Sequence, residues 1–596
     1  YEILIGLVGS EMCIRDRIDN VKSPEDIKGF SKEQLEKLAE EIRKGLMNRL
    51  SKKGGHFGPN FGFVEATIAL HYVFNSPVDK FVFDVSHQSY VHKMLTGRKD
   101  AYFYDEHFAE VSGYTNPEES EHDFFNVGHT STSISLACGL AKGRDLKGDN
   151  ENIVAVIGDG SLSGGEALEG LDFASELNSN FIIIVNDNDM SIAENHGGLY
   201  KNLKELRDSD GKCECNLFKA MGLDYRYVAD GNNIESLIKA FEEVKDIDHP
   251  VVVHINTLKG KGYKPAETNK ENWHWCMPFD VETGKSNVDD FGEDYGSLTC
   301  EYLLKKMKQD KSVVVLVAAV PTCIGFTGDK RKEAGKQFID VGIAEEHAVA
   351  MASGIAKNVG KPVFATHSSF FQRTYDQISQ DLCINNNPAT LLVNTASVYG
   401  MNDVTHLGIY DIPMMSNIPN LVYLAPTSCE EYFAMLEWSI EQNEHPVAIR
   451  IPCNGVIRTG KEADADYSVI NRYKVTESGQ DIAIIALGDF YQIGEKLAEL
   501  IADKTGVAPT LINPRYITGI DTEMLEDLKK NHTKVVTLED GILDGGFGEK
   551  IAAFYAATDM KVYNYALKKE FIDRYSVDEI LKENRITPEQ IIEDLQ

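Results

Sequence analysis

The chain has 596 residues, of which 42% are hydrophobic and 26% charged, a balance typical of a globular protein with several domains. Its formal net charge of −33 disfavours binding to nucleic acids or anionic membranes, because such a surface repels their phosphates. The longest apolar runs, such as 313–320, are far shorter than the roughly 18–20 residues of a membrane span, and the ten cysteines contain no C-x-x-C pair. We therefore expect reduced thiols and a cytoplasmic location.

Residues 1–17 (YEILIGLVGSEMCIRDR) resemble a peptide that arises when sequencing-adapter DNA is translated, so we assign them no fold and expect the native sequence to begin near Ile18.

The first predicted element is a helix. Residues 31–52 then carry apolar side chains at helical spacing. Ser31 is placed to cap this helix, and Gln34 to complete a capping box.

The rest of the chain alternates helical patterns with short β-branched runs that are apolar almost throughout. Such runs are typical of strands buried on both faces, and the helices between them indicate mainly parallel sheets in an α/β protein. The predicted strands are 81–85, 153–158, 181–186, 251–256, 313–319, 362–366, 390–394, 421–425, 447–451, 481–488, 509–513 and 534–539.

Two polar stretches rich in Gly and Asp interrupt this alternation, at 281–297 and 459–480. We place domain boundaries there. The prediction is three consecutive α/β domains with mainly parallel sheets, covering residues 18–290, 296–465 and 475–596.

The stretch VIGDGSLSGG (156–165) places Asp159 between two glycines directly after a predicted strand. Ligands of open parallel sheets bind beyond the carboxyl ends of the strands, and the glycines and helix N-terminus that follow suit a phosphate. A carboxylate would repel that phosphate unless a divalent cation such as Mg²⁺ lay between them.

A second oxygen ligand is expected where the next strand ends, and NDNDM supplies Asn188 there. Parallel neighbours bring such strand ends together. Asp, Asn and Gly also favour ordinary turns, so either motif alone would be weak evidence. Their occurrence together favours a metal–diphosphate site.

The surrounding sequence resembles one family. Several stretches, with the GDG and NDN motifs, are similar to the 1-deoxyxylulose-5-phosphate synthase family of the transketolase superfamily, and the likeness runs from Ile18 across essentially the whole chain. They are GGHFGPNFGFVEATIALHYVFN (54–75), FDVSHQSYVHKMLTGRKD (83–100), VGHTSTSISLACGLA (127–141), LKGKGYKPAE (258–267) and GIAEEHAVAMASGIA (342–356).

This resemblance implies a transketolase-like fold with thiamine diphosphate and Mg²⁺ as cofactors. It assigns the metal to Asp159, Asn188 and the carbonyl of Met190. The residues that it places against thiamine diphosphate are His87, Gly128, His129, Thr130, Gly160, Ser161, Asn188, Tyr263 and Glu345.

Glu345 corresponds to the carboxylate that contacts the aminopyrimidine ring. A carboxylic acid that shares a proton with this ring activates thiamine, and burial suits that role because desolvation favours the protonated form. The alternative is a solvated helix surface that carries Glu345, Glu346 and His347.

His56, His87 and His274 are the further catalytic candidates, because the resemblance places them near the reacting carbons. There they would move protons or hold a carboxylate. Each is also compatible with an ordinary structural histidine, and His87 has the closest surrounding match.

The acceptor region departs from the family. In the family, arginines of the second domain hold the phosphate of an aldehyde, and this chain keeps Arg373, His406 and Arg450 as candidate phosphate ligands. The departures are Thr395 and Cys453 where the family usually has arginines, Asn402 where it has an aspartate, and His367 where it has a tyrosine. A threonine hydroxyl offers one neutral hydrogen bond in place of a charge-assisted pair, so either the remaining arginines suffice or the acceptor differs.

The resemblance thus predicts a homodimeric transferase that condenses pyruvate with an aldehyde, most directly D-glyceraldehyde 3-phosphate. CO₂ is lost and 1-deoxy-D-xylulose 5-phosphate, a precursor for isoprenoid and thiamine biosynthesis, is formed. Three alternatives stay open: a related synthase with another aldehyde acceptor, a transketolase acting on ketose phosphates, and a non-catalytic cofactor-binding paralogue. The joint presence of Asp159, Asn188 and Glu345 disfavours the last.

Overall fold

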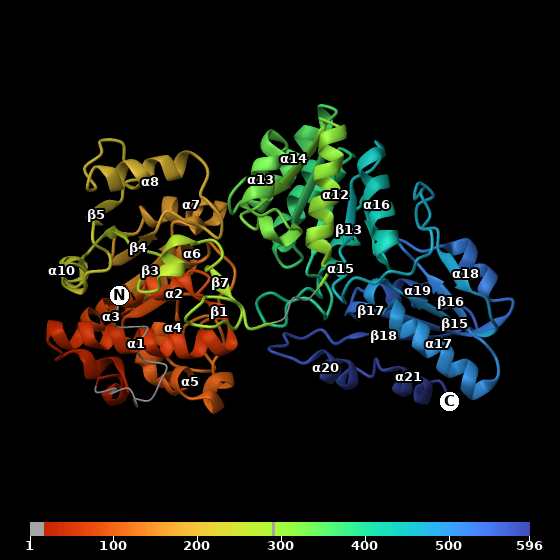
Figure 1. The fold of residues 1–596 in the computed structure, drawn as a ribbon, viewed down its shortest axis with the longest axis horizontal. Coiled ribbons are helices and arrows are strands. Elements are labelled where there is room, and N and C mark those ends of the chain that lie inside the picture. Colours follow the sequence, from red (N-terminus) through yellow and green to blue (C-terminus); the bar gives the residue numbers. More distant parts are fainter. Residues whose placement is uncertain (1–16, 289–291) are drawn as a thin grey trace. The chain divides into compact units, whose positions relative to one another are not determined.

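The computed structural model describes residues 17–288 and 292–596, so the interpretation of the N-terminal peptide lies, apart from Arg17, outside the described residues. The chain divides into two compact units, residues 1–290 and 291–596, and each is described here by itself (Figure 1).

The first unit opens with helix α1, Lys32–Lys53. Ser31 caps it: its Oγ accepts a hydrogen bond from the backbone N of Gln34 at 3.3 Å, and the Gln34 side chain accepts one from the backbone N of Ser31 at 2.7 Å. The pair satisfies two backbone donors that the first turn leaves open, which confirms the predicted helix and its capping box.

A five-stranded, fully parallel sheet forms the centre of the first unit, in the order β2-β3-β4-β6-β5. Successive residues of β3 face opposite sides: Ile153 and Ile157 belong to a buried cluster with α6 and α7, while Val154 and Val156 pack in the cluster that contains α3 and α10. Burial on both faces explains the continuous apolar runs. The bounds are β2 Lys80–Phe83, β3 Ile153–Gly158, β4 Phe181–Asp187, β5 Asp224–Val228, β6 Pro250–Asn256, α3 Val64–Val73, α6 Ser133–Lys147, α7 Gly165–Ala174 and α10 Ile234–Val244.

Shorter elements complete this unit. Strand β1 pairs with β7 in antiparallel fashion and places His56 opposite Trp275. The remaining bounds are β1 Gly55–His56, β7 Trp275–Cys276, α2 Gly58–Gly62, α4 Tyr90–Lys93, α5 Asp100–Phe103, α8 Gly198–Asp208, α9 Leu217–Ala220 and α11 Lys264–Thr268.

The second unit contains two sheets. The first is parallel and six-stranded, in the order β12-β13-β11-β10-β8-β9. Its bounds, with those of the helices between its strands, are β8 Val313–Val317, β9 Phe338–Asp340, β10 Lys361–His367, β11 Thr390–Asn394, β12 Val422–Leu424, β13 Val447–Arg450, α12 Tyr295–Gln309, α13 Gly328–Ala334, α14 Glu345–Lys357, α15 Asp411–Met415 and α16 Cys429–Glu441 (Figure 1).

The other sheet has the order β14-β16-β15-β17-β18, with only the edge strand β14 antiparallel to its neighbour. One buried cluster holds Phe364 and Leu391 together with Ile485 and Val535, so the two sheets share a core and form one compact unit. The bounds are β14 Lys474–Glu477, β15 Asp481–Ala486, β16 Thr510–Asn513, β17 His532–Ile542, β18 Lys561–Leu567, α17 Tyr491–Thr505, α18 Thr522–Leu528, α19 Phe547–Tyr555, α20 Val577–Glu583 and α21 Pro588–Asp594.

The mainly parallel α/β architecture and each of the predicted strands are therefore confirmed. The prediction missed β1, β7 and β9, which are only two or three residues long, and β5, β14 and β18, whose sequences DYRYV, KVTE and KVYNYAL mix polar and apolar side chains. None of the helices in the described ranges combines the length and apolar character that crossing a bilayer requires.

Candidate active site

The ends of β3 and β4 bring the predicted metal residues together. Gly158 is the register partner of Asn186, and the backbone N of Asp159 donates to the Asn186 carbonyl at 3.1 Å. The Asp159 carboxylate in turn accepts hydrogen bonds from the backbone N of Met190 at 3.0 Å and from Asn195 Nδ2 at 2.7 Å. Asn188 lies within this segment, and its buried Oδ1 has no hydrogen-bond partner.

The carboxylates of Asp159 and its neighbour Asp187 differ in how their charge is balanced. The Asp187 carboxylate pairs with Arg207 Nη1 at 2.6 Å and with His254 Nε2 at 2.9 Å, whereas Asp159 is not balanced in this way. Burial and the Asp187 carboxylate raise the pKa of Asp159 to about 7. A buried carboxylate beside an unpartnered amide oxygen has the donor set that a hard divalent cation prefers.

A cation there would depend on neutral oxygen ligands. Nowhere in residues 17–288 or 292–596 do three His, Cys, Asp or Glu side chains gather as a metal site. Besides Asp159, the available ligands are therefore the Asn188 amide oxygen and backbone carbonyls such as that of Met190. The residues present fit Mg²⁺.

Two of the glycines after Asp159, Gly160 and Gly164, are required by close packing. A Cβ on Gly160 would lie 2.9 Å from Ser191 Oγ, and one on Gly164 would collide with the Ser131 side chain. Ser131 Oγ also donates to the Ser161 carbonyl at 2.7 Å. The GDGSLSGG loop is thereby fixed against its neighbours.

The turn that carries Gly128, His129 and Thr130 is held by Asp84. The Asp84 carboxylate, just beyond β2, accepts hydrogen bonds from the backbone N of Ser131 at 2.8 Å and of Ser133 at 3.0 Å. Sequence reasoning missed Asp84, although its place directly after an apolar run was a signal.

The three candidate histidines form one cluster. The ring centroids of His56 and His87 are 5.0 Å apart. The ring centroid of His274 lies 5.7 Å from that of His56 and 5.3 Å from that of His87. Burial, together with Lys259 and the other two histidines, lowers the pKa of His274 well below its ordinary value. The neutral imidazole of His274 is therefore favoured.

Two further polar residues of this region were not predicted. Asn60 Nδ2 donates to the carbonyl oxygens of both His56 and His87. Lys259, only 2% exposed, donates from Nζ to the Ser191 carbonyl at 2.6 Å, and burial lowers its pKa to about 7. The predicted cofactor residue Tyr263 instead donates its hydroxyl to the Val281 carbonyl and packs in an aromatic cluster with Trp273.

In the second unit, Glu345 is the first residue of α14 and is only 3% exposed. Its Oε2 has no hydrogen-bond partner, and Arg373 Nη1 is 4.0 Å away. The low exposure of Glu345 excludes the solvated surface position that the sequence left open for it, and burial raises its pKa to about 7.

Two histidines of the acceptor region lie beside Phe370. The ring of His367 is 5.3 Å and that of His406 is 5.6 Å from the Phe370 ring. His367 Nδ1 is 2.7 Å from Thr395 Oγ1, and burial lowers the pKa of His367 to about 4. His406 Nδ1 faces Asp403 at 3.0 Å. His367 and Thr395, two of the positions that depart from the family, are thus in direct contact and uncharged.

Arg450 is enclosed by carboxylates. Its Nε donates to Asp411 Oδ2 at 2.8 Å, its Nη1 pairs with Asp540, and the residue is 4% exposed. The guanidinium is therefore engaged within the protein. Asn402, the third departure, donates from Nδ2 to the Tyr575 carbonyl at 3.0 Å.

Thr395 has a positive φ of 52° and a tightly surrounded backbone. A Cβ at either Gly400 or Gly408 would collide with the Thr395 carbonyl oxygen. The backbone N of Ser397 donates to the Gly408 carbonyl at 2.7 Å and closes the loop. Glycines at these two positions let the chain wrap around Thr395.

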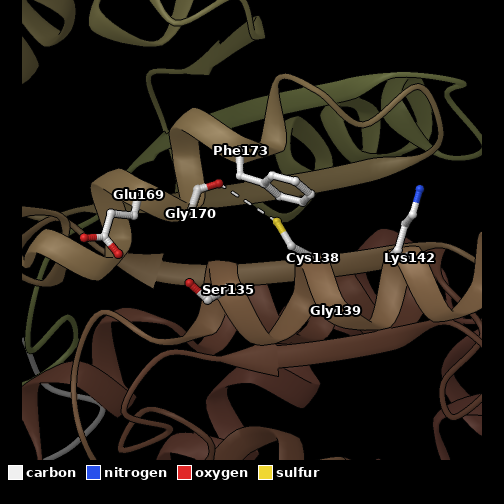
Figure 2. Close-up of a pocket in the computed structure, with 7 residues that line it drawn as sticks. All are labelled: Ser135, Cys138, Gly139, Lys142, Glu169, Gly170 and Phe173. Carbon is white, nitrogen blue, oxygen red and sulfur yellow. Dashed lines mark hydrogen bonds between the residues drawn. The ribbon is translucent and has the colours of Figure 1, made fainter.

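A separate surface pocket contains none of the predicted residues. Figure 2 shows side chains from α6 and α7 around it, with Cys138 Sγ directed at the Gly170 carbonyl, 3.9 Å away. Its lining residues are Ser135, Cys138, Gly139, Lys142, Glu169, Gly170 and Phe173.

Comparison with known proteins identifies the family. Residues 18–215 and 209–257 match the family model described as 1-deoxy-D-xylulose-5-phosphate synthase, 294–455 match the transketolase pyrimidine-binding domain, and 471–591 the transketolase C-terminal domain. The 1-deoxy-D-xylulose-5-phosphate synthase of Desulforudis audaxviator is 36% identical over 93% of each chain. The chain belongs to the 1-deoxy-D-xylulose-5-phosphate synthase family. The enzyme of that name from Halothermothrix orenii is 38% identical over 91% of each chain.

Membership of the 1-deoxy-D-xylulose-5-phosphate synthase family confirms the resemblance, the transketolase-like fold and the prediction of a transferase. Among solved structures, a transketolase from Leishmania mexicana is similar with a TM-score of 0.43 and 15% identity, covering 94% of this chain and 96% of its own. A transketolase from Campylobacter jejuni gives a TM-score of 0.44 and 17% identity, covering 94% and 99%.

Proposed function

We propose that this protein condenses pyruvate with an aldehyde, with loss of CO₂, in a reaction that depends on thiamine diphosphate and Mg²⁺. With D-glyceraldehyde 3-phosphate as acceptor, the product is 1-deoxy-D-xylulose 5-phosphate. The observation that carries the proposal is the buried Asp159 carboxylate next to the unpartnered Asn188 amide oxygen, in a chain whose relatives bear the name of that synthase.

In the first unit, Asp159, Asn188 and the Met190 carbonyl would bind Mg²⁺. The diphosphate would bind the backbone of Gly160 and Ser161 and the turn with Gly128, His129 and Thr130. His87 and Tyr263 would also contact the cofactor. The buried Lys259 lies close enough to Asp159 to affect its pKa, and in its protonated form it would offset further negative charge of a diphosphate.

In the second unit, Glu345 would hold a proton against the aminopyrimidine ring. Bound thiamine diphosphate supplies a carbon nucleophile and then accepts the electrons released with CO₂. Because the pKa of Glu345 is about 7, the carboxyl exchanges this proton readily near neutral pH. His56, His87 and His274 would orient the pyruvate carboxylate and move protons at the reacting carbons.

For the acceptor, we propose Arg373, His406 and Arg450 as phosphate contacts. A specific observation also supports the alternative of a different aldehyde. His367 and Thr395 contact each other as uncharged groups, and the Arg450 guanidinium is occupied by Asp411 and Asp540. An unphosphorylated acceptor fits this surface.

The deciding experiment is an acceptor screen. The protein is incubated with pyruvate, Mg²⁺, thiamine diphosphate and a panel of phosphorylated and unphosphorylated aldehydes, and products are identified by mass spectrometry. Formation of the five-carbon deoxyketose phosphate supports the main proposal, and a different condensation product selects the alternative acceptor. Transfer from a ketose phosphate without CO₂ release identifies a transketolase, and no turnover with any pair identifies the non-catalytic paralogue.

Cofactor binding is tested separately with Asp159→Asn. Mg²⁺ and thiamine diphosphate together should raise the Tm of the parent protein and leave that of Asp159→Asn unchanged, because Asp159 is the one charged group among the proposed protein ligands of the metal. Asp230→Asn, an exposed aspartate of the same unit, is the control and should retain the full shift.

A homodimer, a cytoplasmic location and domain limits at 18–290, 296–465 and 475–596 remain part of this proposal. Sedimentation equilibrium tests the dimer. Limited proteolysis followed by mass spectrometry tests the limits, because cleavage should concentrate in the polar stretches between them.

A further inference from the structure

The first unit contains a buried network of charged and imidazole groups that is separate from the cluster of His56, His87 and His274. Asp123 receives both terminal nitrogens of Arg98, at 2.7 Å and 2.9 Å, and His92 Nε2 at 2.8 Å. Glu119 pairs with Lys93 and lies 3.2 Å from Arg98 Nη1. The side chains of Lys93, His92 and Asp123 are all fully buried.

The hydrogen-bond directions within this network follow from Asp123. Its carboxylate can only accept, so His92 Nε2 donates to it and His92 Nδ1 must accept from His71 Nε2, 2.9 Å away. His71 Nδ1 is then an acceptor, which agrees with its being buried without a donor. Burial lowers the pKa of both His71 and His92, so the chain of imidazoles is neutral.

The two carboxylates clasp one short backbone segment. Glu119 Oε1 accepts a hydrogen bond from the backbone N of Ser112 at 2.6 Å, and Asp123 Oδ2 accepts one from the backbone N of Asn116 at 2.8 Å. These bonds fix both ends of residues 112–116. Lys93, Arg98 and His92, which hold the carboxylates, follow His87 in the chain by fewer than a dozen residues.

The clasped segment contacts His56 and the residue that precedes His87. The Tyr114 ring lies 5.8 Å from the His56 ring. The backbone N of Thr115 donates to Ser86 Oγ at 2.8 Å, and Ser86 Oγ donates to the Val127 carbonyl at 2.7 Å. Ser86 directly precedes His87.

The turn before His87 needs such external support. Val85 and Ser86 both have positive φ, 57° and 63°, a conformation that L side chains rarely adopt. Strained backbone of this kind persists only where the surroundings over-determine it. The bonds from Thr115 and to Val127 are the contacts that hold Ser86 in place.

We propose that Asp123 and Glu119 are positioning residues for the reaction, which act through the clasped segment 112–116 on the orientation of His56 and His87. This inference rests on the proposed function, because only in that reaction do the two histidines face a substrate. The geometry thereby adds to the proposed active site two residues that act through others and lie more than thirty positions from both histidines in the sequence.

The test compares Asp123→Asn with Glu118→Gln, an exposed carboxylate of the same loop that makes no side-chain contribution to the clasp. Asparagine keeps the size of the side chain but removes the anion. Hydrogen–deuterium exchange, followed by mass spectrometry without substrates, should show faster exchange at residues 112–116 in Asp123→Asn only. Turnover per cofactor-loaded site should fall about 10- to 100-fold, as expected for small misplacements of catalytic groups, while the Tm shift on adding Mg²⁺ and thiamine diphosphate stays at the parental value.

Unchanged exchange at 112–116, or turnover per loaded site within twofold of the parent, would overturn the inference. A variant that is merely less stable would keep its turnover per loaded site, so stability alone cannot imitate the expected result. Should Asp123→Asn fail to fold, Glu119→Gln, at the more accessible end of the clasp, takes its place with the same two outcomes. Failure of the proposed function would look different: the parent protein itself would not turn over pyruvate, while the exchange difference would persist.

Discussion

Asn60 Nδ2 donates a hydrogen bond to the carbonyl oxygen of His87 at 2.7 Å, and the same nitrogen donates to the carbonyl oxygen of His56 at 2.7 Å. Asn60 Oδ1 also accepts from the backbone N of Tyr90 at 3.0 Å. One fully buried carboxamide thus ties together two chain segments that are far apart in sequence but carry neighbouring imidazoles.

Replacing this carboxamide should separate the histidines. Asn60→Ala leaves two carbonyls and one N–H without partners, and we expect the free energy of unfolding to fall by about 1–3 kcal/mol. Turnover should fall together with stability. Urea unfolding and steady-state kinetics measure the two effects, and Asn178→Ala, which removes an exposed amide, should change neither.

Glu345→Gln should abolish decarboxylation of pyruvate. Glutamine has the shape of the acid but cannot exchange a proton with the aminopyrimidine ring. Binding of Mg²⁺ and thiamine diphosphate, measured by calorimetry, should stay within a few-fold of the parent. Near-normal CO₂ release would contradict the assignment of Glu345.

The same substitution should change how stability depends on pH. Burial raises the pKa of Glu345 from 4.5 to about 7, so the folded protein binds this proton more tightly than the unfolded chain does. That contribution to stability is fully present below pH 4.5 and is lost as the pH rises through 7. Between pH 5 and 8 the unfolding free energy of the parent should therefore fall relative to Glu345→Gln by up to about 3 kcal/mol.

Urea titrations of the cofactor-free protein at several pH values measure this difference. Glu301→Gln, which changes an exposed glutamate on α12, should follow the parent at every pH. Parallel pH profiles for the parent and Glu345→Gln would show that the buried carboxyl keeps an ordinary pKa.

Arg450→Met should separate a structural from a phosphate-binding role. Because the guanidinium balances Asp411 and Asp540 in the interior, its loss leaves buried charge uncompensated and should cost about 3–5 kcal/mol. The matched control is Arg458→Met, whose exposed pair with Glu293 should matter by less than about 1 kcal/mol. A stable Arg450→Met protein with a raised KM for the phosphorylated aldehyde would instead assign Arg450 to the substrate.

Thr395→Arg should lower the KM for a phosphorylated aldehyde. A charge-assisted bond from arginine is worth about 1.5–3 kcal/mol, which corresponds to roughly a 10- to 100-fold change. Thr395→Gln supplies length without charge and should leave that KM unchanged. If Thr395→Arg behaves like Thr395→Gln, the acceptor phosphate binds elsewhere.

Much of the fold was predictable because it depends on local pattern. Continuous apolar runs such as 153–158 could only be strands buried on both faces, and the structure places each in a parallel sheet. The edge strand β14 (KVTE) was not predictable in this way, because one antiparallel neighbour and exposed side chains leave no apolar pattern.

The position of Asp159 was predictable because the GDG motif directly follows a strand, and its role as a metal ligand stays a prediction. Asn60 and Asp84 were missed because their roles arise from tertiary contacts to distant backbone atoms. Arg450 was predicted to bind a phosphate because the sequence does not show what pairs with an arginine. Only the fold reveals that two carboxylates, one of them ninety residues away, pair with it.

The loop around Thr395 also bears on how substrate preference can change. Gly400 and Gly408 close around the carbonyl oxygen of residue 395, and these backbone contacts do not depend on which side chain that residue carries. The shape of the loop is therefore separable from the chemistry of the side chain at residue 395. That side chain can be exchanged on an unchanged backbone, whereas a side chain at Gly400 or Gly408 would collide with the backbone of residue 395.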